Sequence, residues 1–298
     1  MNIKSALSND RSCKALTGLS IHEFNNLLET FNLIYQEIIH QLKPHRKRKI
    51  GAGIKGNLPD ISDKLFLILF YLKCYPTYDL LSFLVGFDRS RSCRWVIFLL
   101  PILEKTLGRK LVLPKRRISS FEDFITLFPE AKDIFIDGTE RRVQKPVSQK
   151  RRKKLYSGKK KGTTRKNIVV SNEKNEVLVI SQTKSGRRHD KRLADKIGLE
   201  NAPPEVTFWT DTGLMGIQKY HPNTQMPKKK TKGKPLTEKE REENKLKSGI
   251  RVLSEHAIAG IKRMRSTTDV YRNRIANLDD SFMLLSSGLW NYHLNYSS

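Results

Sequence analysis

Cysteine is scarce in this chain of 298 residues. Its three cysteines, Cys13, Cys74 and Cys93, are odd in number, far apart and without a Cys-x-x-Cys spacing. This pattern excludes a scaffold built on disulfides and offers no spacing typical of a zinc site. We expect the thiols to be reduced and mostly buried, as they are in cytosolic proteins.

Long hydrophobic runs are also missing. The longest, at residues 65–72 and 96–103, fall well short of the roughly 20 residues that a helix needs to span a bilayer. The first residues, Met1 to Ser5, lack the apolar core of a signal peptide. We therefore expect no membrane partner and a cytoplasmic location.

Acidic residues are few relative to basic ones. The chain has 57 Lys and Arg against 30 Asp and Glu, a formal net charge of +27. At this charge, attraction to a polyanion dominates any encounter, which makes nucleic acid the first partner to consider. Because 38% of the residues are hydrophobic, the chain can bury a core, and its length suggests two domains or one large domain with an appendage.

The N-terminal region, residues 1–120, has a helical pattern. Apolar residues at helical spacing predict one amphipathic helix over residues 20–43. Three short apolar segments follow, at residues 62–75, 78–85 and 90–100. Short helices joined by a glycine-bearing turn are typical of a helix-turn-helix, here at about residues 60–105, whose last helix enters a DNA major groove.

The last of these helices should begin at a capping Asp88 or Ser90, and Pro101 should end or kink it. Three residues, Trp95, Val96 and Leu99, should face inward. Three arginines occupy its first turns, where base edges are contacted: Arg89, Arg91 and Arg94. The alternative is a small helical bundle whose arginines only solvate a surface.

From residue 121 to residue 298 the pattern changes to α/β. Short apolar runs predict strands at residues 134–137, 167–171, 177–181 and 206–210. One helix is expected at residues 190–197, before the fourth strand, and a longer one near residues 244–265, after it. Three strands that can pair as a meander, followed by a helix, a strand and a helix, indicate a ribonuclease-H-like domain.

A strongly basic insertion interrupts this domain at residues 141–166. It contains 13 Lys or Arg residues and no acid, so we expect a loop or an arm that follows phosphates rather than a packed element. The candidate contacts are Arg151, Arg152, Lys159, Lys160 and Lys161. The alternative is a solvated, mobile insertion. In a second charged stretch, Thr237 and Glu240 have the spacing of a capping box, so a helix should begin at Glu238.

Carboxylates in three contexts suit a metal-dependent enzyme. Asp137 and Asp211 each follow an apolar run and precede a glycine, which predicts a strand end at each, and Glu255 lies in the long helix. Together they offer the hard oxygen ligands that Mg²⁺ or Mn²⁺ prefers. Taken alone, Glu255 is better explained as a solvated partner of Arg251 than as a metal ligand. Spacing does not rank three other carboxylates below it: Glu140, Asp190 and Glu205.

Several motifs occur in a fixed order between about residues 60 and 295. The first group comprises Tyr75-Pro76-Thr77-Tyr78, Ile136-Asp137-Gly138-Thr139-Glu140, Tyr156-Ser157-Gly158-Lys159-Lys160-Lys161 and Gly186 with His189-Asp190. The second comprises Asp211-Thr212-Gly213 with Gly216, Asn244 with Arg251, Glu255, His256 and Lys262, then Tyr271-Arg272-Asn273 and Phe282-Met283-Leu284. On these motifs the chain resembles bacterial insertion-sequence transposases of the DDE superfamily, in the group related to the IS five family.

The resemblance implies that Asp137, Asp211 and Glu255 form a catalytic triad that holds two Mg²⁺ or Mn²⁺ ions for phosphoryl transfer. It implies double-stranded DNA as partner, both the terminal inverted repeats of the element and target DNA, with Arg251 and Lys262 on phosphates. It further implies a dimer or larger assembly in the synaptic complex, and a bacterial, nucleoid-associated location. Thr212 and Leu214 stand where the family usually has lysine and tyrosine. The alternatives are a non-catalytic DNA-binding relic or repressor, or a metal-dependent nuclease on the same fold.

Overall fold

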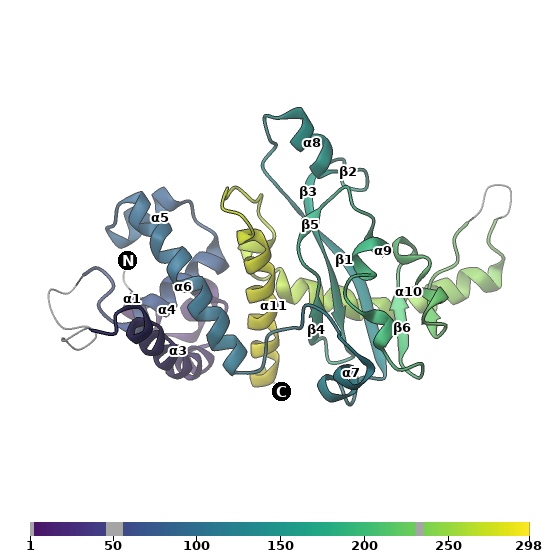
Figure 1. Cartoon of the computed structure of the whole chain (residues 1–298), viewed down its shortest axis with the longest axis horizontal. Coiled ribbons are helices and arrows are strands. Elements are labelled where there is room, and N and C mark those ends of the chain that lie inside the picture. The colour runs from purple at the N-terminus through teal and green to yellow at the C-terminus, as the bar shows by residue number, and fades with distance from the viewer. Residues whose placement is uncertain (1–2, 46–55, 231–234, 298) are drawn as a thin grey trace. The chain divides into compact units, whose positions relative to one another are not determined.

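The computed structural model describes residues 3–45, 56–230 and 235–297, which form two compact units (Figure 1). The helical unit contains the residues up to Leu113, the segment Lys262–Asp269 and the chain from Asn291 onward. The sheet unit contains Pro114–Ile261 and Val270–Trp290. The sequence places a boundary between residues 120 and 121. By contacts, the division falls between Leu113 and Pro114, and two later segments rejoin the helical unit.

The helical unit begins with three helices, α1 Ile3–Ala6, α2 Asp10–Thr17 and α3 Ile21–Leu42. The long helix α3 starts where the sequence predicts it. Ser20 and Glu23 form a reciprocal capping box that satisfies amide groups of its first turn. The inward stripe of α3 includes Phe24, Leu27 and Phe31, all buried. Apolar periodicity and a cap therefore agree on this helix.

Three further helices form the helix-turn-helix, α4 Ile61–Cys74, α5 Tyr78–Val85 and α6 Arg89–Arg109. The turn between α5 and α6 uses Gly86 at φ 75°, a conformation that side chains disfavour, and Asp88 then caps α6 by accepting the Arg91 amide. Pro101 was expected to end or kink α6, and it does not end it, since the helix continues to Arg109. The buried leucines around Pro101 offset the hydrogen bond that proline removes.

Within the described residues, the sheet consists of seven strands: β1 Asp133–Arg142, β2 Tyr156–Ser157, β3 Gly162–Ser171, β4 Val177–Ile180, β5 Lys184–Ser185, β6 Thr207–Thr210 and β7 Thr224–Gln225. The order is β2-β3-β1-β6-β7, with β4 and β5 also paired to β3. Strands β1, β3 and β4 form an antiparallel meander, and β6 runs parallel to β1. The predicted order of strands and helices is confirmed, and the domain is ribonuclease-H-like.

The helices of the sheet unit are α7 Phe121–Leu127, α8 Gln149–Leu155, α9 Asp190–Ala194, α10 Glu238–Ile261 and α11 Leu278–Ser297, whose end belongs to the helical unit. Short 3-10 turns are η1 Leu199–Asn201, η2 Thr212–Leu214, η3 Ile217–Lys219 and, in the helical unit, η4 Arg265–Thr267. The predicted start of α10 is confirmed, because Thr237 and Glu240 exchange capping hydrogen bonds. The helix ends at Ile261, so Lys262 lies beyond it.

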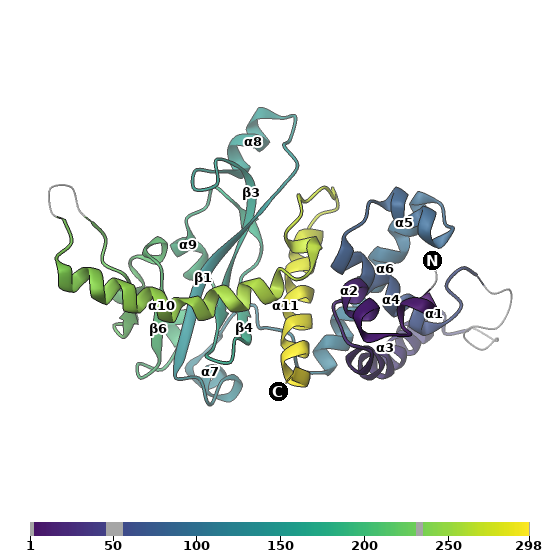
Figure 2. The same ribbon diagram turned by 180° about the vertical axis from the view of Figure 1, so that it is seen from behind.

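Two layers of helix cover opposite faces of the sheet. Ile134 and Ile136 of β1 join one buried cluster with Leu193 and Ala194 from the α9 region. Helix α10 contacts β1, β3 and β6, and it crosses the sheet on the side seen in Figure 2, behind the side where Figure 1 shows α9. Side chains of β1 therefore face these two layers alternately.

The basic insertion is more ordered than the sequence predicts. Strand β1 runs to Arg142, α8 occupies the middle of the segment, and β3 begins at Gly162. Arg141 and Lys166 are buried, contrary to the expectation of a loop too charged to pack. Their carboxylate partners lie outside the insertion, at Asp279 for Arg141 and at Glu140 and Asp190 for Lys166.

Candidate active site

Asp137 and Asp211 occupy equivalent places on neighbouring strands. The parallel ladder between β1 and β6 ends at the pair Ile136 and Thr210, and each aspartate is the next residue. Strand β6 ends there, as expected, but β1 continues, with Asp137 opposite Val169 of β3. The expected strand end at Asp137 is therefore wrong. What ends there is the parallel pairing of β1 with β6. Because each aspartate is the residue after the last pair, the two aspartates lie next to one another on adjacent strands.

Backbone amides fix the orientation of both carboxylates. Oδ1 of Asp137 accepts a hydrogen bond from the Gly138 amide at 2.7 Å. Asp211 caps the 3-10 turn η2, and its Oδ1 accepts from the Gly213 amide, also at 2.7 Å. The glycine that follows each aspartate is thus part of the local geometry of the site.

The alternation along β1 decides which face Asp137 occupies. Ile134 and Ile136 point into the cluster on the α9 side, so Asp137 belongs to the face that α10 covers. Glu255 of α10 is exposed, and it flanks the stripe of α10 that includes buried Ser254 and Ile258. Asp137 and helix α10, which carries Glu255, therefore lie on the same side of the sheet, the side that faces the viewer in Figure 2.

The three carboxylates do not form a closed metal cage. In residues 3–45, 56–230 and 235–297, no group of three His, Cys, Asp or Glu side chains is arranged to hold a metal ion. Asp137 and Asp211 adjoin at the end of the ladder, and Glu255 lies on the adjacent helix. Their assignment as metal ligands remains a prediction.

Lys159 links the basic insertion to this site. Its Nζ lies 3.8 Å from Oδ2 of Asp211, and its side chain is 62% exposed. An exposed ion pair of this kind contributes only about 0–1 kcal/mol, so the lysine is easily drawn to another anion. One of the lysines predicted to contact DNA therefore stands beside one of the predicted catalytic aspartates.

A buried ion network lies on the opposite face of β1. Nζ of Lys166 is 3.2 Å from Oε1 of Glu140 and 2.8 Å from Oδ1 of Asp190, and Thr164 donates a 2.7 Å hydrogen bond to Glu140. Burial alone raises the pKa of Glu140, but hydrogen bonds from Thr164 and Ser157 and the charge of Lys166 outweigh it and hold the pKa below its ordinary value. Burial lowers the pKa of Lys166, but the hydrogen bonds to Asp190 and Glu140 and the charges of these two carboxylates together outweigh burial and raise the pKa above its ordinary value.

The same network reaches the two glycines of the active site. A Cβ atom at Gly138 would lie 3.2 Å from Oδ2 of Asp190, and one at Gly213 would lie 3.4 Å from the same oxygen. The segments that carry Asp137 and Asp211 thus both pack against the Asp190 carboxylate. The sequence offers Glu140 and Asp190 as rival metal ligands, whereas the structure pairs both with Lys166.

The arginines predicted to read DNA lie in the first turns of α6 and are exposed. Arg89 is 3.7 Å from Asp79, and the Arg91 guanidinium lies 5.5 Å from the centre of the Phe87 ring. Arg94 is one turn further along. Of the three residues predicted to face inward, Val96 and Leu99 are buried, whereas Trp95 is half-buried. The charged side of this helix is therefore open to solvent in its own unit.

The remaining predicted DNA contacts differ in accessibility. Four of them are exposed, Arg151, Lys159, Lys160 and Lys161. Arg152 is half-buried and donates a 2.8 Å hydrogen bond to the Val147 carbonyl. Arg251 lies on α10, but its side chain is outside the described residues. Lys262 is exposed, beyond the end of that helix.

The sequence reasoning gave no role to two features of the site. Lys166 was counted only as one basic residue of the insertion, although pairing in register with Glu140 follows once β1 and β3 are aligned. Leu214, at a position where the family usually has a polar aromatic residue, is 1% exposed within the sheet-unit core. Its burial explains why an apolar residue is tolerated there.

Comparison with known proteins agrees with this architecture. The chain matches the family described as DDE superfamily endonuclease over residues 136–291, more than half of its length. It also matches the helix-turn-helix of DDE superfamily endonuclease over residues 56–109. The chain belongs to the DDE superfamily of endonucleases, in its insertion-sequence transposase branch, and is an enzyme. Members use divalent metal ions, and the helix-turn-helix implies DNA binding.

A similar protein is described as a probable transposase for insertion sequence element IS702, from Microchaete diplosiphon. The two are 27% identical over 284 residues, which are 95% of each chain. No solved structure matches this chain at a significant level. None of the helices in the described part of the chain is both long and apolar enough to cross a membrane.

Proposed function

We propose that this protein cleaves the ends of an insertion element and joins the freed 3′-hydroxyls to target DNA. The observation that carries the proposal is the placement of Asp137 and Asp211 directly after the last pair of the parallel ladder, with Glu255 on the helix that covers this face. These three side chains supply only hard oxygen donors, which suit Mg²⁺ or Mn²⁺. They would hold two ions, which when bound activate the attacking oxygen and stabilise the leaving 3′-oxygen.

The chain's own residues supply positioning and charge. The Gly138 and Gly213 amides hold the two aspartates in a fixed orientation, and Lys159 neutralises a phosphate close to Asp211. Further phosphate contacts come from Arg151, Arg152, Lys160, Lys161, Arg251 and Lys262. His189 and His256 are exposed and orient DNA rather than bind metal.

Recognition of the element ends belongs to the helical unit. Arg89, Arg91 and Arg94 are exposed at the start of α6, where a recognition helix contacts base edges in the major groove. Because an element has two ends that must be cut and joined together, the working assembly is a dimer or larger. Each copy would contribute one helix-turn-helix to one terminal inverted repeat.

The test is strand cleavage by the Asp211→Asn variant, on DNA that carries the terminal inverted repeats, with Mg²⁺ present. We expect cleavage to be abolished and binding to the element ends to change less than about twofold, because one ligand is lost while the basic surface is kept. Glu205→Gln is the matched control, since this exposed carboxylate precedes β6 at the end opposite Asp211. It should cleave like the unaltered protein.

Two outcomes would contradict the proposal. If Asp211→Asn retains near-normal cleavage, Asp211 is not a ligand, and Asp190→Asn becomes the next variant to measure. If the unaltered protein binds the element ends but cuts no DNA with Mg²⁺ or Mn²⁺, it acts as a DNA-binding repressor.

A further inference from the structure

A basic cavity lies in the sheet unit, away from the aspartates. Its volume is about 860 Å³, within the range of pockets that hold organic ligands. It is bounded by the end of β1, helix α8 and the start of β3. Six cationic side chains line it, Arg142, Lys145, Arg152, Lys153, Lys161 and Arg187, and no acidic residue of the described chain does.

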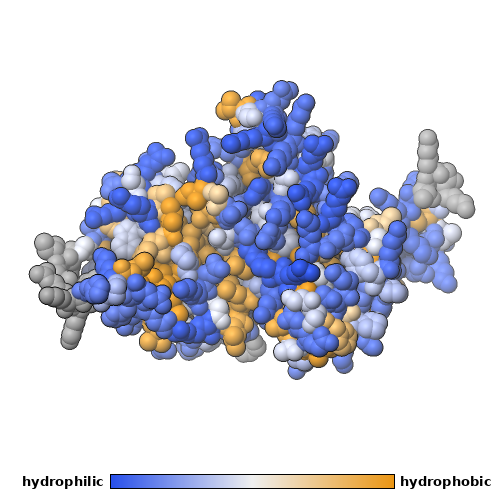
Figure 3. Space-filling view, viewed as in Figure 1, coloured by the Kyte–Doolittle hydropathy of each residue, from blue (hydrophilic) through white to orange (hydrophobic). Residues whose placement is uncertain are grey.

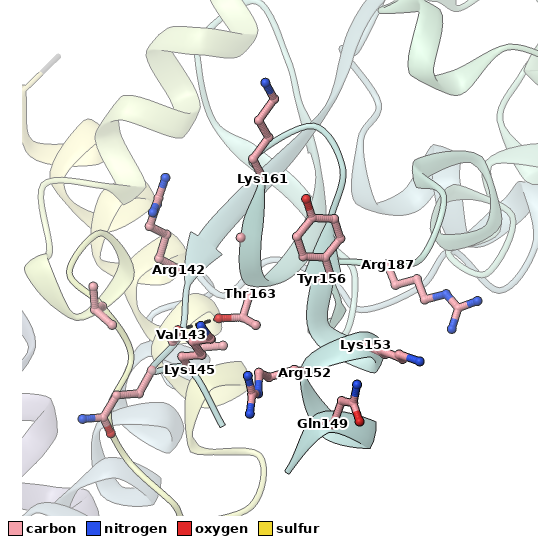
Figure 4. Close-up of a pocket in the computed structure, with 13 residues that line it drawn as sticks. Arg142, Val143, Lys145, Gln149, Arg152, Lys153, Tyr156, Lys161, Thr163 and Arg187 are labelled. Atoms are coloured by element: carbon pink, nitrogen blue, oxygen red, sulfur yellow. Dashed lines mark hydrogen bonds between the residues drawn. The ribbon is translucent and has the colours of Figure 1, made fainter. Parts of the chain in front are cut away.

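The cavity also has an apolar surface. Tyr156 is 50% exposed, and Val143 and Val270 add aliphatic walls. In Figure 4 the tyrosine lies between Lys161 on one side and Lys153 and Arg187 on the other. Thr163 donates a 3.0 Å hydrogen bond to the Val143 carbonyl, which fixes one wall. An exposed ring set among cations in a concave site fits a ligand that is both flat and anionic.

We propose that this cavity binds unpaired DNA, with a base against Tyr156 and the flanking phosphates on the surrounding cations. Duplex DNA keeps its bases stacked inside the helix, so a surface that only follows duplex phosphates needs neither an exposed ring nor apolar walls. Single strands are held by this combination of a positive groove and an aromatic platform. The proposal rests on DNA being the substrate, as proposed above.

The position of the cavity along the chain supports this ligand. Tyr156 and Lys161 line the cavity, and Lys159 between them reaches Asp211. One short turn therefore contacts both places, so a strand unpaired near the scissile phosphate has a continuous positive path into the cavity. Figure 3 shows a mainly hydrophilic surface over the region of α8 and β2, with hydrophobic atoms at its tip and below it.

The test compares binding of a fluorescein-labelled decamer of thymidylate with binding of a ten-base-pair duplex, using the full chain without divalent metal. Tyr156→Ala should weaken single-strand binding about tenfold, because one base–aromatic stack is lost, and should change duplex binding less than about twofold. Tyr156→Phe keeps the ring and should bind like the unaltered protein. Arg187→Ala should weaken single-strand binding more than duplex binding. Arg188→Ala, at an exposed arginine that does not line the cavity, should leave their ratio unchanged.

A second measurement needs no variant. A decamer with 2-aminopurine at its centre should lose fluorescence on binding the unaltered protein, because the base stacks on the tyrosine ring. Absence of this quenching overturns the proposal, as does equal weakening of single-strand and duplex binding by Tyr156→Ala. If the protein binds neither DNA, the proposed function fails as well. If the protein binds the duplex but shows neither the quenching nor the selective weakening by Tyr156→Ala, this inference fails and the proposed function stands.

Discussion

Replacing Lys166 by methionine should destabilise the sheet unit strongly. The lysine side chain is 7% exposed and lies between the carboxylates of Glu140 and Asp190, which are 6% and 16% exposed. Methionine keeps the aliphatic stem but leaves both acids without their counter-charge. Breaking a buried ion pair in this way typically costs 3–5 kcal/mol, and the partial exposure of Asp190 places the expected loss near the lower end, at about 3 kcal/mol.

The loss should depend on pH in a defined direction. The pKa of Glu140 is held below its ordinary value, so the charged carboxylate contributes stability that is present above its unfolded pKa and is lost as pH falls through the folded pKa. In Lys166→Met the counter-charge is absent, and we expect the pKa of Glu140 to rise. The deficit of the variant should therefore be largest near neutral pH and should shrink as pH falls below about 5.

The assay is urea-dependent hydrogen exchange of peptides from β1 and β3, which reports the sheet unit separately from the helical unit. Lys184→Met is the control, because Lys184 pairs in register with Lys166 but donates its hydrogen bond to the neutral Gln182. It should change stability by about 0.5 kcal/mol or less. Adding Glu140→Gln to Lys166→Met should restore part of the loss. A loss under about 1 kcal/mol, or no recovery in the double variant, would refute this account of the network.

Two further predictions use matched positions. A Cβ at Gly260 would lie 2.2 Å from the ring of Trp290, so Gly260→Ala should cost about 1–3 kcal/mol of unfolding free energy. Gly249→Ala is the control, because Gly249 lies in the same helix with open space around it, and this variant should be neutral or stabilising by up to about 1 kcal/mol. Thermal unfolding of both variants tests this, and equal changes in melting temperature would contradict the close packing of Gly260 against Trp290. Arg91→Ala or Arg94→Ala should relax the sequence preference of binding, and each should cost about 1–3 kcal/mol of binding free energy if a bidentate base contact is lost. Lys160→Ala should weaken binding to all DNA sequences alike and reduce the slope of log K against log salt concentration by about one unit. Salt titrations of binding to element-end DNA and to random DNA test both predictions. If Lys160→Ala loses discrimination and the arginine variants keep it, the roles of the two regions are reversed.

The sequence was informative where a segment buries one face. Alternating or continuous apolar runs gave β1, β3, β4 and β6 in the right order, and the capping box placed the start of α10. Helix α11 went unpredicted because apolar residues lie on nearly all of its sides, among them the buried Phe282 and Leu285, so no amphipathic period marks it. The two-residue strands β2, β5 and β7 are too short to carry a pattern.

The site was predictable only as far as local context reaches. Gly138 within β1 and Gly213 in the turn after β6 each donate a backbone amide hydrogen bond to the aspartate that precedes them. Partners across the sheet were not predictable. Arg141 and Lys166 sit in a run without acids, and their burial depends on Asp279, Glu140 and Asp190, which are brought to them by β1, α9 and α11.

These buried pairs separate the catalytic candidates from their rivals on energetic grounds. A metal ion that recruited Glu140 or Asp190 would have to break their contacts with Lys166, a change that costs several kcal/mol inside a protein. Among the described residues the cation paired with Asp211 is Lys159, whose exposed ion pair is worth about 0–1 kcal/mol and yields readily to a stronger cation. Among these neighbouring carboxylates, Asp211 is thus the one that can exchange its partner at low cost, which favours it over Glu140 and Asp190 as a ligand.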